Sequence, residues 1–274
     1  MIPADHLTAA IDDLHLTNHP IMLHASLRSF EAVIDGGVDT VLDALLTRGC
    51  TVMVPAFTES QFGLPAPADI RPRRNGIDYS AIPAVNAPPE SPPYSVDCGL
   101  INPALGLLPA TLIERVDTVR GRHPLNSFAA VGPQAAELIG AQTPGDVYGP
   151  IRELADRDGT ILLIGVNLNR MTALHLAEQQ SGRRLFRRWA RDEHGEVRMV
   201  EVGSCSEGFP QLEPVLNPLA RSTMVGSSRW RAYPAQHVLA DATAAIIADP
   251  NITRCADPEC MLCRDAIAGG PIPA

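Results

Sequence analysis

The sequence predicts an α/β protein: a mixed, largely parallel sheet core flanked by helices, with a long proline-rich loop and a small C-terminal lobe. Unbroken apolar runs at residues 20–24, 51–55 and 160–166 are typical of strands that are buried on both faces, which favours parallel pairing. Segments with helical periodicity separate these runs. No internal repeat or clean linker divides the chain, so we expect one domain over residues 1–274.

The first part of the chain has the pattern of a β–loop–α–β unit. Apolar positions over 4–16 predict a short amphipathic helix, and the strand at 20–24 is followed by a polar turn at 25–29. The next helix has an apolar stripe from Val38 to Leu46 and is capped by Gly49, after which the strand at 51–55 begins.

Residues 59–110 have a different composition. Ten of the 25 prolines fall here, together with Arg71, Arg73 and Arg74, and the segment has little periodicity. Irregular segments of this length in compact domains are commonly functional loops. We expect a loop that covers the site, followed by a short helix at 109–115.

The second half of the chain continues the alternation of strands and helices. The predicted elements are a turn at 122–127 that leads into a strand ending at 132, helices at 133–139 and 150–157, the strand at 160–166, a helix at 173–180, a hairpin at 184–191 and 196–202, a mixed segment at 211–219 and a helix at 234–248. Thr172 is the expected N-cap of the helix at 173–180. A cysteine-rich tail occupies 250–274.

The totals exclude several classes of protein. A net charge of −9 and a pI near 5.3 argue against a nucleic-acid or anionic-membrane partner, and they are compatible with a cationic substrate. The chain has no run of eighteen apolar residues, so no membrane span is predicted, and the N-terminus lacks the basic region of a signal peptide. We therefore expect a cytoplasmic protein whose six cysteines are thiols or metal ligands.

The strongest candidate for chemistry is the pair His175 and Glu178. Their spacing places both on one face of the helix that follows the strand at 160–166. Open α/β sheets bind ligands at such junctions, and a histidine oriented by a carboxylate is a candidate general base. A solvated or structural pair is the alternative.

Two other segments offer polar groups beside predicted strands. The turn formed by Ser26, Leu27, Arg28 and Ser29 has consecutive backbone N–H groups, two hydroxyls and a guanidinium, and such a turn can bind a pyrophosphate. It lacks the glycines of nucleotide-binding loops, so an ordinary turn is the alternative. His123 and Ser127 add an imidazole and a hydroxyl, and a structural role is equally compatible with the sequence.

The remaining candidates lie late in the chain. Cys255, Cys260 and Cys263 form a C-x4-C-x2-C cluster that suits a structural zinc ion, and Cys205, His194 or His237 could supply a fourth ligand. Cys205 could alternatively be a nucleophile activated by His175, or a buried inert thiol. The acids Glu207 and Glu213 could bind a substrate ammonium or simply be solvated surface charges.

Five segments in order resemble the aminoglycoside 3-N-acetyltransferase family, whose fold is not that of the common GNAT acetyltransferases. They are HASLRS at 24–29, VMVPAFT at 52–58, HPLNS at 123–127 running on to Gly132, LIGV at 163–166 running on to TALHLAE at 172–178, and CSEGF at 205–209. The match extends over roughly residues 20–245. Many members of the family have a second histidine where this chain has Asn126.

The resemblance implies acetyl transfer from acetyl-CoA to a primary amine of an aminoglycoside-like substrate, in a cleft of an α/β core. It implies that His175 is the general base, that Glu178 is the carboxylate beside it, and that Ser26–Ser29 and Ser127 are cofactor contacts; we expect His123 to contact the cofactor as well. It also suggests a homodimer. The alternatives are an amine other than an aminoglycoside, a covalent Cys205/His175 acyltransferase, and a binding protein without activity.

Overall fold

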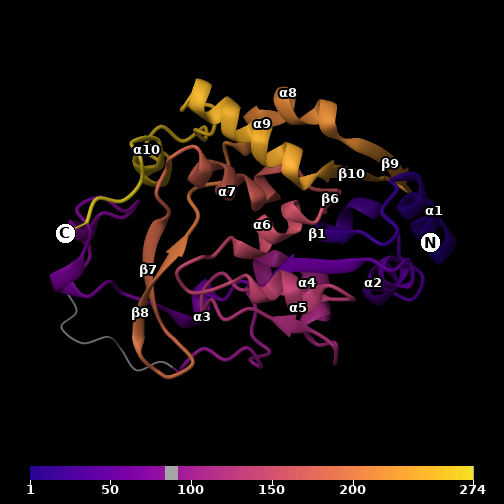
Figure 1. Cartoon of the computed structure of the whole chain (residues 1–274), viewed down its shortest axis with the longest axis horizontal. Helices are drawn as coiled ribbons and strands as arrows, with labels where there is room; N and C mark the ends of the chain where they lie inside the picture. The colour runs from indigo at the N-terminus through magenta and orange to yellow at the C-terminus, as the bar shows by residue number, and fades with distance from the viewer. Residues whose placement is uncertain (84–91, 274) are drawn as a thin grey trace.

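The computed structural model describes residues 1–83 and 92–273, and it contains a large mixed sheet and a small antiparallel sheet (Figure 1). The large sheet has seven strands in the order β4-β5-β2-β1-β6-β10-β9, and the small sheet has three in the order β3-β7-β8. The strands are β1 (Pro20–Ala25), β2 (Thr51–Pro55), β3 (Gly63–Leu64), β4 (Val119–Arg120), β5 (Phe128–Val131), β6 (Thr160–Ile164), β7 (Phe186–Arg191), β8 (Val197–Val202), β9 (Arg221–Val225) and β10 (Ser228–Pro234).

Helices cover both faces of the large sheet, which makes it the middle layer of three. The helices are α1 (Ala4–Asp13), α2 (Val38–Thr47), α3 (Glu59–Phe62), α4 (Leu107–Ile113), α5 (Ala135–Gly140), α6 (Gly149–Asp156), α7 (Ala173–Gln180), α8 (Glu213–Leu216), α9 (Ala235–Ala248) and α10 (Met261–Ile267). On one face α1, α2 and α4 pack over alternate residues of β1 and β6, such as Leu23 and Leu162. On the other face α5 to α9 pack over the intervening residues, such as Met22 and Leu163.

The predicted strands at 20–24, 51–55 and 160–166 are confirmed, but the prediction of a largely parallel sheet is wrong. In the described part of the chain only the pairs β1–β2 and β1–β6 of the large sheet are parallel. The pairs β4–β5, β2–β5, β6–β10 and β9–β10 are antiparallel. An unbroken apolar strand indicates burial on both faces, and helices on both faces bury antiparallel strands equally well.

Most predicted helices are present with small shifts at their ends, and the hairpin predicted at 184–191 and 196–202 is the antiparallel pair β7–β8. The side chain of Thr172 makes no capping hydrogen bond, although α7 begins directly after it. The strands β9 and β10 were not predicted. Three of the five residues of β9 are polar or charged, and this strand lies at the exposed edge of the sheet, so it lacks the apolar signal.

The proline-rich segment joins the two parts of the molecule. Its first part, which contains β3, packs on the small sheet through the pairing of β3 with β7. Its later residues return to the large sheet, where Asn102 N–H donates to Phe57 C=O at 2.7 Å. Residues 84–91 of the predicted loop lie outside the described residues. Pro65 to Ser80 therefore contributes to a small lobe with β7 and β8, as Figure 1 shows at the left.

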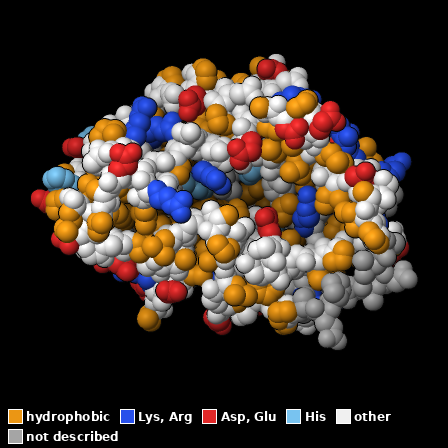
Figure 2. Space-filling model, turned by 180° about the vertical axis from the view of Figure 1, so that it is seen from behind, with side chains coloured by type: hydrophobic (Ala, Val, Ile, Leu, Met, Phe, Trp, Pro, Cys, Tyr) orange, Lys and Arg blue, Asp and Glu red, His pale blue; other side chains and the backbone are white. Residues whose placement is uncertain are grey.

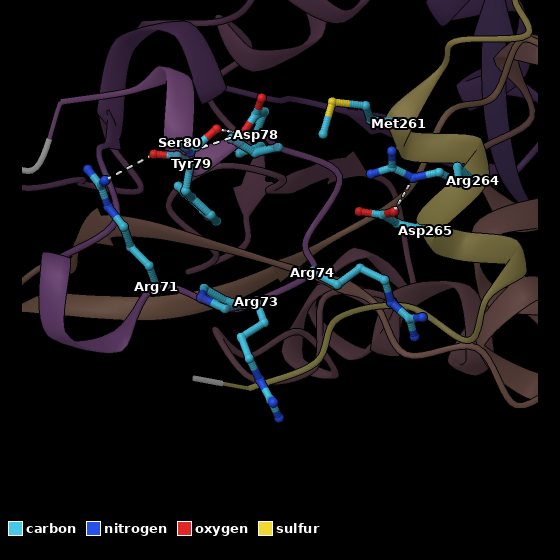
Figure 3. Close-up of a pocket in the computed structure, with 11 residues that line it drawn as sticks. Arg71, Arg73, Arg74, Asp78, Tyr79, Ser80, Met261, Arg264 and Asp265 are labelled. Atoms are coloured by element: carbon cyan, nitrogen blue, oxygen red, sulfur yellow. Dashed lines mark hydrogen bonds and ion pairs between the residues drawn. The ribbon is translucent and has the colours of Figure 1, made fainter.

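The C-terminal segment completes this small lobe rather than forming one of its own. Arg74 donates to the carbonyls of Ala268 and Gly270 at 2.6 and 2.7 Å, and Arg71 donates to the carbonyls of Ile82 and Pro83. These arginines line a cavity of about 560 Å³ between residues 71–80 and α10 (Figure 3). Because backbone carbonyls already engage Arg71 and Arg74, this cavity is a structural junction.

No helix in the described residues is long and apolar enough to cross a membrane.

Candidate active site

A cavity of about 880 Å³ lies where the parallel strands β1, β2 and β6 end. This is the edge at which open α/β sheets bind ligands. The face turned away in Figure 1 is hollowed, and arginine, acidic and histidine side chains surround the hollow (Figure 2). The cavity is lined by residues at or after the ends of the three strands and by residues from other parts of the chain: Leu23–Arg28, Pro55, Phe57, Glu59, Asn102–Pro109, Asn126, Tyr148, Val166, Asn169, Arg170, Thr172, His175, Gly203, Ser204 and Ser206.

The turn after β1 is fixed against the end of β6. Ser26 N–H donates to Ile164 C=O at 2.9 Å, and the Ser29 hydroxyl lies 2.7 Å from that of Ser228. Gly165 has a positive φ, and a Cβ there would lie 2.1 Å from the Cβ of Ser29, so only glycine fits this approach. Ser26, Leu27 and Arg28 line the cavity, whereas Ser29 holds the turn together from behind.

His175 and Glu178 lie together on α7, as their spacing predicts. Nδ1 of His175 is 2.9 Å from Oε2 of Glu178, and both side chains are almost fully buried. Burial opposes the charged form of Glu178, but hydrogen bonds from His175 and Ser204 and the charge of Arg183 outweigh it, so its pKa is lowered. Glu178 is therefore a carboxylate at neutral pH and accepts the proton on Nδ1. Nε2 of His175 has no hydrogen-bond partner among the described residues.

Aromatic and backbone groups fix the orientation of the His175 ring. Tyr148 stacks on it with ring centroids 6.2 Å apart, and Phe209 meets it edge-on at 4.8 Å. Gly203 passes so close that a Cβ at this position would lie 2.7 Å from the imidazole and 2.5 Å from the Tyr148 hydroxyl. These contacts, together with Glu178, fix the ring, and His175, whose Nε2 has no partner among the described residues, is one of the residues that line the cavity.

Two polar groups on the cavity wall lack partners. Nε2 of His24 and Oδ1 of Asn126 are buried and make no hydrogen bond within the described residues. Burial, with a smaller effect of the Arg170 charge, lowers the pKa of His24 to about 3, so His24 is neutral. Unpaired buried polar atoms are costly, which makes both atoms candidate ligand contacts. The sequence signal for His24 was its position at the end of a buried strand, immediately before the polar turn.

The structure places His123 and Ser127 behind the cavity wall. Nε2 of His123 is 2.9 Å from Glu201 C=O, and its Nδ1 accepts from Asn126 N–H at 2.9 Å. The Ser127 hydroxyl donates to Ala56 C=O at 2.7 Å. Burial lowers the pKa of His123 to about 4. Neither residue is among those lining the cavity, so any effect on a ligand would pass through neighbours such as Asn126.

These two neutral histidines predict that the fold weakens in mild acid. The unfolded-state pKa of a histidine is about 6.5, and those of folded His24 and His123 are about 3 and about 4, so below pH ~6.5 the unfolded chain binds protons that the folded chain does not. This stability is fully present above pH ~6.5 and is lost as the pH falls. Between pH ~7 and ~5 we expect a loss on the order of 1–2 kcal/mol per histidine in urea unfolding.

The variant His123→Gln should lose about half of this pH dependence, while replacement of the exposed His194 should leave it unchanged. Equal unfolding free energies for the parent chain at the two pH values would contradict the prediction. Glu178 does not interfere, because its lowered pKa confines its effect to more acidic conditions.

The two acids proposed to bind substrate lie near the cavity but do not line it. Glu207 is exposed and accepts from the side chain of Asn169, which does line the cavity, at 3.1 Å. Glu213 lies 3.6 Å from Arg231. The acid that lines the cavity is Glu59, in the first turn after β2, and no motif in the sequence marks it.

Cys205 points toward the cysteine-rich tail. Its neighbours Ser204 and Ser206 line the cavity, but Cys205 does not. The Sγ atoms of Cys205, Cys255, Cys260 and Cys263 all lie within 4.8 Å of one another, which answers the question of the fourth group in the cluster. From the sequence, Cys205, His194 and His237 were all candidates for the fourth residue of the cluster; in the structure that residue is Cys205.

Together, these features place the chain among α/β proteins that have a buried histidine–carboxylate pair in a cavity at the ligand-binding edge of the sheet. The sequence profile of the family described as aminoglycoside 3-N-acetyltransferase matches residues 22–246, a range that contains every residue of the pair and most of the cavity wall. The chain belongs to this family.

Individual proteins and solved structures are also similar to this chain. The chain is 33 % identical over 174 residues to aminoglycoside N(3)-acetyltransferase IX of Micromonospora chalcea, an alignment that covers 61 % of this chain and 58 % of that protein. Crystal structures with the same fold include the apoenzyme of aminoglycoside acetyltransferase AAC(3)-IVa, with a TM-score of 0.75 at 22 % identity over 98 % of this chain and 97 % of that one. A structure of AAC-IIIb in a binary complex with CoASH has a TM-score of 0.72 at 22 % identity, over 89 % of this chain and 96 % of that one.

Proposed function

We propose that this chain is an acetyl-CoA-dependent N-acetyltransferase that moves an acetyl group to a primary amine, the 3-amino group of an aminoglycoside, and so confers antibiotic resistance in the cytoplasm. Family membership supports the reaction class. The observation that carries the proposal for this chain is the buried His175–Glu178 pair, whose imidazole lines the large cavity and has Nε2 free.

The pair fits the chemistry that amine acetylation needs. An aliphatic amine is protonated at neutral pH and cannot attack a thioester until a base removes its proton. Glu178 holds the proton of the neutral ring on Nδ1, which leaves the lone pair on Nε2 of His175 to accept the ammonium proton. The amine nitrogen then bonds to the acetyl carbon and gives up a second proton as the carbon–sulfur bond breaks. Of the two protons lost by the nitrogen, one is taken up by the departing CoA thiolate and the other passes to solvent.

Acetyl-CoA would bind at the turn after β1. The Ser26 N–H is already engaged by Ile164 C=O, so Leu27 and Arg28 are the residues of the turn that bring backbone N–H groups to the cavity. The side chains of Arg28 and Arg170 line it without a hydrogen bond or ion pair to any described residue. Free guanidinium groups beside exposed backbone amides suit the pyrophosphate of CoA. The capture of CoASH by AAC-IIIb supports this role at the family level. The predicted contacts of Ser29, His123 and Ser127 would be indirect.

The acceptor would occupy the part of the cavity near Glu59. A polycationic amine is attracted by carboxylates, and Glu59 lies on the wall while Glu207 adjoins it through Asn169. A direct role for Glu213 is less well supported, since it is engaged with Arg231. The unpaired atoms of His24 and Asn126 would hydrogen-bond to one of the two substrates.

The proposal is tested by measuring release of free CoA thiol from acetyl-CoA against a panel of amines. We expect release that depends on an aminoglycoside with a free 3-amino group, and product mass spectrometry should locate the acetyl group on that nitrogen. Thiol release with only a simpler amine would support the acetyltransferase activity but would show that the acceptor is not an aminoglycoside. If no amine gives thiol release although calorimetry shows that CoA binds, the proposal is contradicted.

The same samples test the covalent alternative. The chain contains no lysine, so an acetyl adduct formed in the absence of an acceptor would not come from a lysine amine, and peptide mapping would locate it. We expect no adduct by intact-mass measurement, because the Cys205 thiol lies in the cysteine cluster and not on the cavity wall. An acetyl group on Cys205 that an amine then removes would establish the covalent mechanism instead.

A further inference from the structure

The four cysteines gathered from distant parts of the chain form a cluster with no role in acetyl transfer. Cys205 follows β8, Cys255 and Cys260 precede α10, and Cys263 is in the first turn of α10. All four are free thiols, and every pair of Sγ atoms is within 4.8 Å. Packing of apolar cysteines would not require all four sulfur atoms to converge on one point.

The geometry points to a bound metal ion. Zinc–thiolate bonds of about 2.3 Å in a tetrahedron place the sulfur atoms about 3.8 Å apart, a spacing that the 4.8 Å cluster reaches with small side-chain adjustments. The backbone N–H of Cys255 already donates to Sγ of Cys263 at 3.3 Å, as amides do around metal-bound thiolates. We propose that Cys205, Cys255, Cys260 and Cys263 bind one structural Zn²⁺ ion.

The position of the cluster indicates what such an ion would stabilise. Cys205 lies beside Ser204, whose hydroxyl donates to Oε2 of Glu178 at 2.7 Å. The segment before Cys255 supplies Thr253 and Pro250, which accept hydrogen bonds from Arg183, the ion-pair partner of Glu178. The ion would cross-link the two segments that hold the Glu178 carboxylate from opposite sides.

Close contacts between these segments support the cross-link. A Cβ at Gly208 would lie 2.1 Å from Thr253 C=O, and the side chain of Gln211 donates to Arg254 C=O. These contacts bring the loop after β8 against the start of the tail without a disulfide between the described cysteines. Four closed thiolate ligands also leave no open coordination position, so the ion would be structural and not catalytic.

The test measures metal in the full-length chain purified under reducing conditions without added metal. We expect about one zinc ion per chain by elemental analysis, and Co²⁺ substitution should give the thiolate charge-transfer and visible bands of a tetrahedral site. The variant Cys260→Ser should lose the zinc and lower the melting temperature by about 10 °C, whereas Cys98→Ser, outside the cluster, should retain both.

Three results would overturn the proposal: parent protein free of metal that also fails to bind Co²⁺, stoichiometric iron in place of zinc, or a disulfide between any two of the four cysteines. If Cys260→Ser does not fold, the Co²⁺ spectrum and zinc content of the parent chain still decide the question. Metal content is independent of turnover, so failure here is distinguishable from failure of the proposed acetyltransferase activity.

Discussion

The variant His175→Ala is expected to lose most of its turnover while it still binds CoA. Removal of a positioned general base costs about 10²- to 10⁴-fold in rate. The other histidine that lines the cavity, His24, is a weak replacement because its pKa is lowered to about 3, and Asn126 carries no basic nitrogen. CoA affinity should survive, since the turn after β1 is held by its own contacts with β6. The rate of thiol release at saturating substrates and calorimetry with CoA measure the two effects.

A second substitution at this position separates chemistry from packing. His175→Gln retains a side-chain amide that can donate to Glu178, so it should fold like the parent and still lose the rate. His194→Gln is the matched control, because His194 is exposed on the turn between β7 and β8. A rate within about threefold of the parent for both His175 variants would remove His175 from the mechanism.

The variant Arg183→Leu is expected to lower the free energy of unfolding by about 3–5 kcal/mol, since it leaves a buried carboxylate without its cationic partner. Nη1 of Arg183 lies 2.5 Å from Oε1 of Glu178 and 2.8 Å from the Thr253 hydroxyl, and Nη2 donates to Pro250 C=O at 2.6 Å. Loss of the positive charge should also raise the pKa of Glu178 relative to the parent. Urea unfolding at neutral pH measures the loss.

The adjacent Arg184 provides a control, because its side chain is exposed; Arg184→Leu should change stability by less than about 0.5 kcal/mol. The double variant Arg183→Leu/Glu178→Gln should be more stable than the sum of the single variants predicts, because removing the carboxylate charge relieves the need for a partner. Strict additivity of the two changes would mean that the ion pair contributes nothing beyond its separate parts.

Local patterns were sufficient for the central elements and for the principal pair. The apolar runs that form β1, β2 and β6, and the three-residue spacing of His175 and Glu178, depend on residues close together in sequence. The direction of the outer strands was not predictable in this way. An apolar strand looks the same whichever way its neighbour runs, and β9 lies at an exposed edge.

The partners of the pair came from residues far apart in the chain. Ser204 donates to Glu178, and Thr253 accepts from Arg183, the ion-pair partner of Glu178; no local pattern marks Ser204 or Thr253. The same holds for Cys205, which the sequence offered both as a nucleophile and as a fourth metal ligand.

By itself, the sequence determined the α/β class, the strand-to-helix junction with its histidine and carboxylate, and the cysteine spacing of the tail, because each is written in a run of neighbouring residues. Only the tertiary structure decided which side chains line the cavity, that His123 and Ser127 lie behind its wall, and that Cys205 joins the tail. The physical reason is that burial and contact depend on how separate segments pack, and packing is set by the whole chain rather than by any one stretch of it.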